Sequence, residues 1–248
     1  MLNQIKPTRQ ARPPRVVIHG AHKVGKSTFA AAAPRPIFVA TEDGQDNIDA
    51  EAFPLCQSWQ SVLDCITALY QEDHDYQTVV LDSGDWAERL AWGAVAKDHN
   101  VDSIEGIGYG KGYVFAADLF RELLDGLNAL RNHKAMQVIV ICHSEIKRFD
   151  DPLAQSYDRH QIKLHKLCGK MLQEYADVIG FCQIDSVTQT EDHGFKKERA
   201  RVIDTGRRIL RLAPSAAYDA GNRYGLPASI PLDYQAFADA MSAALLPG

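Results

Sequence analysis

The chain has 248 residues, of which 46% are hydrophobic and 24% charged, and its formal net charge is −5. These values are ordinary for a globular protein and fit one large α/β domain. No apolar run approaches the roughly 20 residues of a transmembrane helix, and the acidic balance argues against a uniformly basic nucleic-acid-binding protein.

The first residues, 1–15, are polar and basic and include three prolines, so we expect a flexible arm there. They lack the apolar segment of a secretion signal. The five cysteines form no C-x-x-C pair. An odd number of cysteines without an export signal predicts reduced thiols and a cytoplasmic location.

Residues 20–27 have the sequence Gly-Ala-His-Lys-Val-Gly-Lys-Ser, which fits the G-x-x-x-x-G-K-S pattern of a phosphate-binding loop. A β-branched run at 16–18 precedes the loop, and an alanine-rich stretch at 26–33 predicts a helix after it. Glycines let successive backbone N–H groups face one anion, and the helix N-terminus adds positive potential. We therefore expect nucleotide to be bound by Gly20, Ala21, His22, Lys23, Val24, Gly25, Lys26, Ser27 and Thr28.

Two side chains of this loop have expected roles. Lys26 can reach the β- and γ-phosphates, and the Ser27 hydroxyl can coordinate Mg²⁺. A second apolar strand, at 37–40, ends in polar residues 41–44, and a third, at 78–82, ends in Asp82. When a phosphate loop precedes it in the sequence, an acid at the end of an apolar strand is typical of a Mg²⁺ site. We therefore predict that Asp82 holds the Mg²⁺ shell through water or by way of Ser27.

In the rest of the chain, predicted helices and strands first alternate, and consecutive strands then follow. Helices are predicted at 58–70, with Ser58 as N-cap, and at 85–99 and 114–131. A fourth strand at 136–142 ends in Cys-His-Ser and is followed by a long polar stretch at 145–165, which we expect to be a functional or disordered loop. After a short helix at 165–175, we expect strands at 177–189, 196–204 and 207–212, with turns at 193–194 and 205–206, and a closing helix at 233–245.

This pattern predicts an α/β fold: a mainly parallel central sheet with helices on both faces, extended by C-terminal antiparallel hairpins, in one domain over residues 16–248.

Charge is segregated along the chain. Residues 36–85 contain eleven Asp or Glu and no Lys or Arg, whereas residues 195–211 contain seven Lys or Arg and two acids. The basic segment can bind a polyanion locally, or both segments are simply solvated faces.

Residues 100–113 alternate glycine with Ile, Tyr and Lys. A mobile loop of this kind can stack bases and contact phosphates, and a plain glycine-rich connection is the equal alternative.

The order of these motifs resembles the RecA-type ATPase core. More narrowly, residues 16–236 are similar to the small phage-encoded RecA-like proteins that are grouped with the AAA-type ATPases, some of which are single-strand annealing recombinases. The resemblance implies ATP and Mg²⁺ as cofactors, and a homo-oligomeric ring or filament with ATP at the subunit interface. It also implies DNA-stimulated hydrolysis in the bacterial host cytoplasm, with a single-strand DNA-binding protein as a further candidate partner.

The resemblance also assigns residue roles. Glu42 stands where RecA-type proteins keep the glutamate that polarises the attacking water, and His143 stands where RecA has a glutamine that senses the γ-phosphate. Arg223 resembles one of two cations that reach the neighbouring subunit's ATP; Gly221 replaces the other, so hydrolysis is expected to be slow or to act only as a switch. DNA contacts are expected in residues 104–113 and after His143, at Tyr109, Lys111, Lys147, Arg148, Phe149, Arg159 and Lys163.

The leading hypothesis is therefore an ATPase that binds single-stranded DNA and promotes annealing or homologous recombination. The alternative is a nucleotide-switched replication or packaging accessory protein with little turnover. A small-molecule kinase, with Arg207, Arg208 and Arg211 as lid residues, and a metal site at His160, His165 and Cys168 are less favoured.

Overall fold

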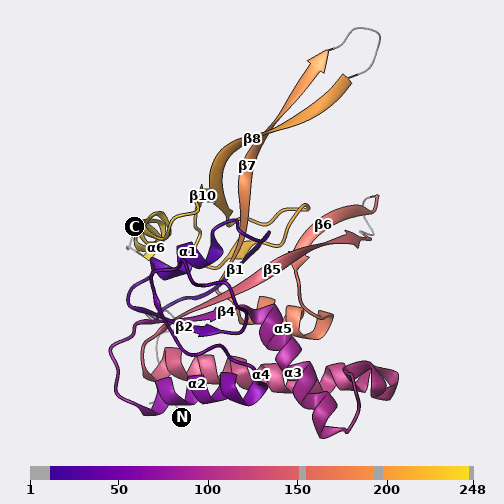
Figure 1. Cartoon of the computed structure of the whole chain (residues 1–248). Helices are drawn as coiled ribbons and strands as arrows, with labels where there is room; N and C mark the ends of the chain where they lie inside the picture. The colour runs from indigo at the N-terminus through magenta and orange to yellow at the C-terminus, as the bar shows by residue number, and fades with distance from the viewer. Residues whose placement is uncertain (1–11, 151–154, 193–197, 246–248) are drawn as a thin grey trace, which may run out of the picture.

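A computed structural model describes residues 12–150, 155–192 and 198–245 (Figure 1). The described residues form a ten-stranded sheet with the strand order β10-β8-β7-β1-β5-β4-β2-β3, with β6 paired to β5 and β9 to β7. The strands are β1 Arg15–Gly20, β2 Pro36–Ala40, β3 Glu51–Ala52, β4 Thr78–Asp82, β5 Gln137–Phe149, β6 Tyr157–Ile162, β7 Val178–Asp192, β8 Glu198–Arg211, β9 Gly221–Asn222 and β10 Ser229–Pro231. The α-helices are α1 Lys26–Ala31, α2 Trp59–Gln71, α3 Gly84–Asp98, α4 Lys111–His133, α5 Lys166–Tyr175 and α6 Tyr234–Leu245.

Adjacent strands from β7 to β3 run parallel, whereas β8 and β10 are antiparallel to their neighbours. This confirms the predicted α/β fold with a mainly parallel sheet and an antiparallel C-terminal extension. β5 lies between β1 and β4, so the strand before the phosphate loop and the strand that ends in Asp82 are not neighbours. In register, Gly20 is beside His143, and Asp82 is beside Ile141. The tip of β5 therefore lies between the phosphate loop and Asp82.

Alternation along the strands separates two hydrophobic cores. Val16 and Ile18 of β1 pack on the side of α1 and α6, whereas Val17 packs on the side of α2, α3, α4 and α5. In β5, Ile139 and Val140 divide in the same way. Successive strand side chains point to opposite faces, so strands covered on both faces appear in the sequence as continuous apolar runs. Figure 1 shows the two helix layers on either side of the sheet.

Two parts of the polar stretch at 145–165, expected to be a loop, are instead paired strands: residues 145–149 and 157–162 form a β-hairpin. β5 continues past its core segment to Phe149 and pairs antiparallel with β6, from Ser144 opposite Ile162 to Phe149 opposite Tyr157. The hairpin projects from the body of the protein (Figure 1). The hydrophobic pattern of the sequence does not indicate these strands because they are exposed to solvent; even Ile146 is 64% exposed. Pairing between residues 144–149 and 157–162 forms the hairpin, and such pairing leaves no burial pattern in the sequence.

Two other expectations change. The predicted turn at 205–206 is wrong: β8 is continuous, its pairing with β7 shifts register between Ile184 and Ser186, and Gly206 has φ 73°. A bulge accommodates extra residues, here two on β8 opposite Asp185, without ending the strand, and glycine adopts positive φ at little cost. The glycine-rich residues 100–113 contain two short 3₁₀ turns, Ile104–Gly106 and Gly108–Gly110, before α4 begins.

The predicted turn at 193–194 and residues 1–11 of the predicted arm lie outside the described residues. Within the described ranges, no helix combines the length and apolar character needed to cross a bilayer.

Candidate nucleotide site

The phosphate loop joins β1 to α1 in the predicted order. Gly20 has to be glycine because a Cβ there would lie 2.4 Å from the backbone oxygen of Cys182 on β7. Gly25 has φ 108°, a conformation that favours glycine. The Lys26 side chain is buried, and its Nζ donates to the carbonyls of Gly20 at 3.2 Å and Ala21 at 2.8 Å. The ammonium group therefore lies inside the curl of the loop, where phosphate oxygens could replace these carbonyls as acceptors.

A hydroxyl and a carboxylate meet beside the loop. Ser27 Oγ donates to Asp82 Oδ2 at 2.8 Å, and Gln45 Nε2 donates to the same oxygen at 3.2 Å. Asp82 is only 2% exposed, and burial raises the pKa of its carboxyl group. Oxygen ligands of this kind suit Mg²⁺, which is bound by few protein groups and keeps water and phosphate oxygens in its shell. Ser27 and Asp82 are therefore the residues that would hold the ion.

Glu42 and His143 face each other across the same edge of the sheet. His143 Nε2 lies 3.7 Å from Glu42 Oε1. On its other side, His143 Nδ1 is 2.9 Å from Asp85 Oδ2, and its backbone N–H donates to Asp85 Oδ1 at 3.0 Å. Because a carboxylate only accepts, Nδ1 carries the proton in this contact and Nε2 is directed at Glu42. Asp85 thus orients the imidazole, a role that the sequence analysis missed.

The carboxyl groups around His143 have different environments. Burial raises the pKa of Glu42, against the influence of His143. Asp85 is 3% exposed, and burial disfavours its charge, yet the hydrogen bonds from His143 are enough to lower its pKa. A carboxylate that orients a histidine and a second one with raised pKa are typical of a site that moves protons. The only sequence signal for Asp85 was its place after the Asp82 strand.

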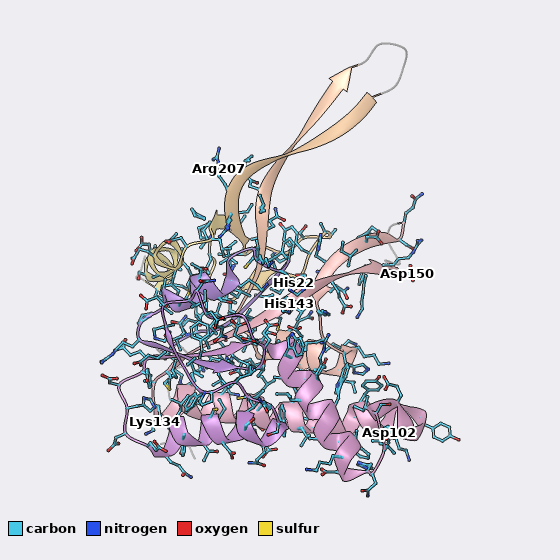
Figure 2. The ribbon with its side chains drawn as sticks, in the orientation of Figure 1. His22, Asp102, Lys134, His143, Asp150 and Arg207 are labelled. Atoms are coloured by element: carbon cyan, nitrogen blue, oxygen red, sulfur yellow. The ribbon has the colours of Figure 1, made fainter. Side chains whose placement is uncertain are left out.

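His22 connects the loop to this group. Its ring stacks on that of His143 with centroids 3.9 Å apart and an interplanar angle of 28° (Figure 2). The nearby His143, and then burial, lower the pKa of His22. The tip of β5 is therefore in direct contact with the phosphate loop.

One cavity of about 670 Å³ joins these residues. Besides the loop residues, Glu42, Asp82 and His143, it is lined by Asn47 and Ile48 of the segment after β2, and by Arg208 of β8. Arg208 Nη1 lies 3.1 Å from the position of a Cβ built on Gly25. Arg208 was considered only as part of a kinase lid; its place beside the loop depends on β8 pairing with β7, which in turn pairs with β1.

Arg223 is not at this edge of the sheet. Its Nη1 lies 3.4 Å from Asp177 Oδ1, and its Nη2 donates to the Glu174 carbonyl at 2.9 Å. Asp177 also pairs with Arg15 at the start of β1, whereas the phosphate loop follows the end of that strand. Arg223 therefore lies near the opposite end of β1 from the phosphate loop of its own chain.

The predicted DNA-contacting residues fall on two segments that approach each other. Tyr113, from the first segment, stacks on His165, which follows the hairpin, with centroids 4.3 Å apart. A cavity of about 260 Å³ is lined by both segments, including Tyr113, Lys147 and Lys163. Tyr109 is fully exposed, and Lys111 begins α4.

Three of the predicted cations have acidic partners. Lys147 pairs with Glu145 at 2.7 Å, Arg148 with Asp150 at 3.7 Å and Arg159 with Asp219 at 3.0 Å. Phe149 packs against Tyr157 across the hairpin and lies under the Arg159 guanidinium. Among the described residues, no group of three or more His, Cys, Asp or Glu side chains is arranged to hold a metal ion, so His160, His165 and Cys168 do not form the site that was considered.

Comparison with known proteins agrees with this geometry. A sequence model of the AAA domain matches residues 12–224, a range that includes the phosphate loop, Asp82 and His143. None of the curated proteins matches the chain. Because the match covers most of the chain and the site has the loop, acid and cavity of a nucleotide-binding enzyme, the protein belongs to the AAA domain family of P-loop ATPases.

Proposed function

We propose that this protein hydrolyses ATP with Mg²⁺, in the manner of RecA-like proteins, and couples hydrolysis to binding single-stranded DNA during annealing or homologous recombination. The observation that carries the catalytic part is the convergence of Lys26, Ser27, Asp82, Glu42 and His143 on one cavity. The phosphates would lie against the N–H groups of the loop, with Lys26 at the β- and γ-phosphates. Ser27 and Asp82 would hold Mg²⁺, whose charge would stabilise the negative charge that develops on the phosphates.

Glu42 is the residue that we assign to the attacking water. Its carboxylate faces the cavity, and its raised pKa makes it a better proton acceptor than an ordinary glutamate. His143 Nε2, held toward Glu42 by Asp85, can accept from that water or, when protonated, donate to the γ-phosphate. The pair thereby links the state of the phosphate to the tip of β5.

The path from nucleotide to DNA runs along β5. This strand is uninterrupted from the core through His143 to Phe149, so a shift of His143 moves the hairpin that carries Lys147 and Arg148. The hairpin and Tyr113 line a common cavity, and this proximity supports a single DNA surface built from both segments. Aromatic and cationic side chains together are typical of surfaces that bind single strands.

A buried network also links the hairpin to the phosphate loop. His19, one residue before the loop, has Nε2 2.6 Å from the Asp219 carbonyl, so Nε2 is the donor; Nδ1 then accepts from Ser144 Oγ at 2.8 Å. The Asp219 carboxylate pairs with Arg159 of the hairpin. Burial lowers the pKa of His19 to about 4, so its imidazole stays uncharged at neutral pH.

Arg223 is our candidate for a cation supplied to the neighbouring subunit in a ring or filament. Arg15 holds both oxygens of Asp177, through Nη2 at 2.8 Å and Nε at 3.1 Å. Arg223 could therefore leave Asp177 without stranding that carboxylate, and its side chain is already 58% exposed. A cation from the next subunit would stabilise transition-state charge on the γ-phosphate.

The decisive experiment measures ATP turnover with and without single-stranded DNA for the wild type and for Lys26→Ala, Glu42→Gln and Arg223→Ala. We expect DNA to raise wild-type turnover and each variant to lose it. Mixing Arg223→Ala with Lys26→Ala should restore activity, because intact sites form where one subunit supplies the loop and the other Arg223. Turnover that ignores DNA contradicts the DNA part, and failure of the mixture contradicts the shared site.

A nucleotide-switched accessory protein is the second candidate. The ion pair that holds Arg223 away from its own phosphate loop favours it, because turnover would then wait for a neighbouring subunit. This function would be favoured if the protein binds MgATP tightly but releases no phosphate. The measurement is made with single-stranded DNA present and at protein concentrations at which subunits assemble.

A further inference from the structure

Two thiols lie side by side at the base of the segment that carries Glu42. Cys56 Sγ and Cys65 Sγ are 3.8 Å apart, and both residues are buried, with 3% and 9% exposure. Cys65 lies on α2, whereas Cys56 precedes the N-cap of that helix by two residues. Both are free thiols.

Cys56 is attached to the end of β2, close to Glu42. β3 pairs parallel with β2, and Cys56 continues this pairing by donating its N–H to the Ala40 carbonyl at 2.8 Å. The ends of the segment 41–55 are therefore held next to each other beside the end of β2. This segment supplies Glu42, Asn47 and Ile48 to the nucleotide cavity and Gln45 to Asp82. A displacement of Cys56 is thus transmitted to Ala40, two residues before Glu42.

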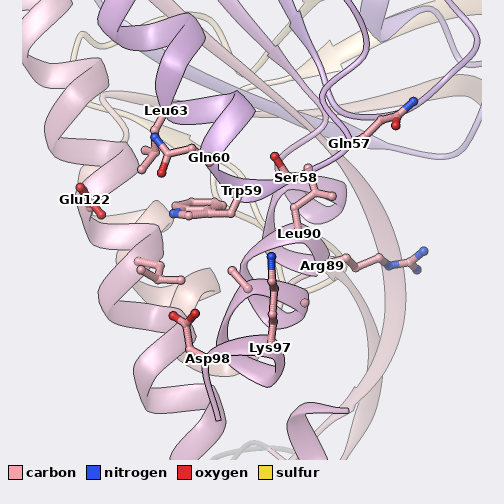
Figure 3. A pocket seen from close by; sticks show the side chains of 13 residues that line it. Gln57, Ser58, Trp59, Gln60, Leu63, Arg89, Leu90, Lys97, Asp98 and Glu122 are labelled. Carbon is pink, nitrogen blue, oxygen red and sulfur yellow. The ribbon is translucent and has the colours of Figure 1, made fainter. Parts of the chain in front are cut away.

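The two sulfurs are chemically unequal. Hydrogen bonding from Cys65, and then from Ser61, lowers the pKa of Cys56 despite its burial. The same contact and burial raise the pKa of Cys65. A thiolate at Cys56 next to a protonated thiol is the arrangement of an attacking and a resolving cysteine. A cavity of about 640 Å³ is lined by Gln57 and Ser58, the two residues that follow Cys56 along the chain (Figure 3).

We propose that Cys56 and Cys65 are a reversible oxidation site, at which a peroxide forms a disulfide that displaces the segment carrying Glu42 and slows ATP turnover. The Cys56 thiolate attacks one peroxide oxygen, forming a sulfenic acid and releasing hydroxide, which takes up a proton to give water. The Cys65 thiol then attacks that sulfur, the S–O bond breaks, and its hydroxyl leaves with the thiol proton as a second water. Two electrons pass from the two sulfurs to the peroxide, and a dithiol reductant reverses the change.

The disulfide has a geometric consequence. The sulfurs must move together from 3.8 Å to a bond of about 2.05 Å. Cys56 is drawn toward α2, which strains its hydrogen bond to Ala40 and shifts Glu42. Because displacement of a catalytic group by about 1 Å can cost about 100-fold in rate, we expect turnover to fall by at least about tenfold.

The experiment treats the reduced full-length protein with hydrogen peroxide, then maps its peptides by mass spectrometry and measures ATP turnover before and after dithiothreitol. We expect a Cys56–Cys65 disulfide in the wild type and the accompanying loss of turnover, both reversed by dithiothreitol. Cys56→Ser and Cys65→Ser should keep their turnover in peroxide. The control is Cys168→Ala, which removes another buried thiol, one that lies on α5, and should respond like the wild type.

The proposal is overturned if peroxide leaves Cys56 and Cys65 as thiols. It is also overturned if another cysteine is oxidised first, whether Cys142, Cys168 or Cys182. A disulfide that changes turnover less than twofold also overturns it, because the link to Glu42 is then missing. The peptide masses do not depend on ATP hydrolysis. A reduced protein without turnover would therefore contradict the proposed function, while the oxidation of the pair would still be decided.

Discussion

Ser27 Oγ donates a 2.8 Å hydrogen bond to Asp82 Oδ2 across 55 residues of sequence. The bond joins the first residues of α1 to the end of β4. α1 follows β1 in the chain, and β5 separates β1 from β4 in the sheet. It brings together the two groups that would hold a Mg²⁺ ion. His143, at the tip of β5, lies between the ends of β1 and β4.

Asp82→Asn and Ser27→Ala should weaken Mg²⁺-dependent nucleotide binding by roughly 10- to 100-fold, the range seen when groups that support a metal site are removed. The measurement is MgATP affinity titrated over Mg²⁺ concentration. Asp64→Asn, on the exposed face of α2, is the matched control and should bind as the wild type does. Equal Mg²⁺ dependence in Asp82→Asn and the wild type would exclude Asp82 from the metal site.

Arg208→Ala should weaken ATP binding by about tenfold or more, because a hydrogen bond to a charged group contributes about 1.5–3 kcal/mol. The reason is its position over Gly25 at the rim of the nucleotide cavity. Arg207→Ala is a close control, because the Arg207 side chain is exposed and is not among the residues that line the nucleotide cavity (Figure 2). Isothermal titration with ATP distinguishes them; equal losses would indicate a general effect of positive charge.

Glu42→Gln should retain ATP binding and lose about 100- to 10,000-fold of turnover, the usual contribution of a general base. The pH profile gives a second test. Because burial raises the pKa of Glu42, wild-type turnover should fall with decreasing pH at values above the ordinary glutamate range. The residual turnover of Glu42→Gln should lack that acidic limb. An unchanged limb in the variant would assign it to another group.

Asp177→Asn should reduce the free energy of unfolding by about 3 kcal/mol, because it leaves the partly buried Arg15 and Arg131 without their anion. Burial opposes the charge of Asp177, but hydrogen bonds from Arg15 lower its pKa. A lowered pKa in the folded state means that the stabilisation is complete above the unfolded value of about 3.9 and is lost as pH falls through the folded value.

Urea unfolding at several pH values measures this effect. The wild type and Asp177→Asn should differ most at neutral pH and converge in acid. A constant difference at all pH values would show that the carboxylate charge does not contribute.

The sequence correctly predicted the parts of the site whose chemistry depends on local spacing. The loop at 20–27, the helix after it and the acid at the end of β4 are each encoded within a few residues, and the structure has them in the predicted places. Ser58 also caps α2: its Oγ accepts from the Ser61 N–H, and its own N–H donates to Ser61 Oγ. Local backbone conformation and hydrophobic periodicity determine such features, so they can be recognised without knowing the fold.

Contacts between distant segments could not be predicted in this way. Asp85 orients His143 because α3 starts beside the end of β5, and Arg208 reaches Gly25 because β8 joins the sheet through β7. The hairpin of β5 and β6 was expected to be a loop because its residues are solvated and their pattern carries no burial signal.

The sequence by itself therefore determined the phosphate-binding loop, since two glycines, a lysine and a hydroxyl within eight residues define that motif. Only the tertiary structure decided which groups surround the loop. Strand order placed β5 between β1 and β4, and with it put His143 between the phosphate loop and Asp82. Strand order is a property of long-range pairing, and no local pattern in the chain specifies it.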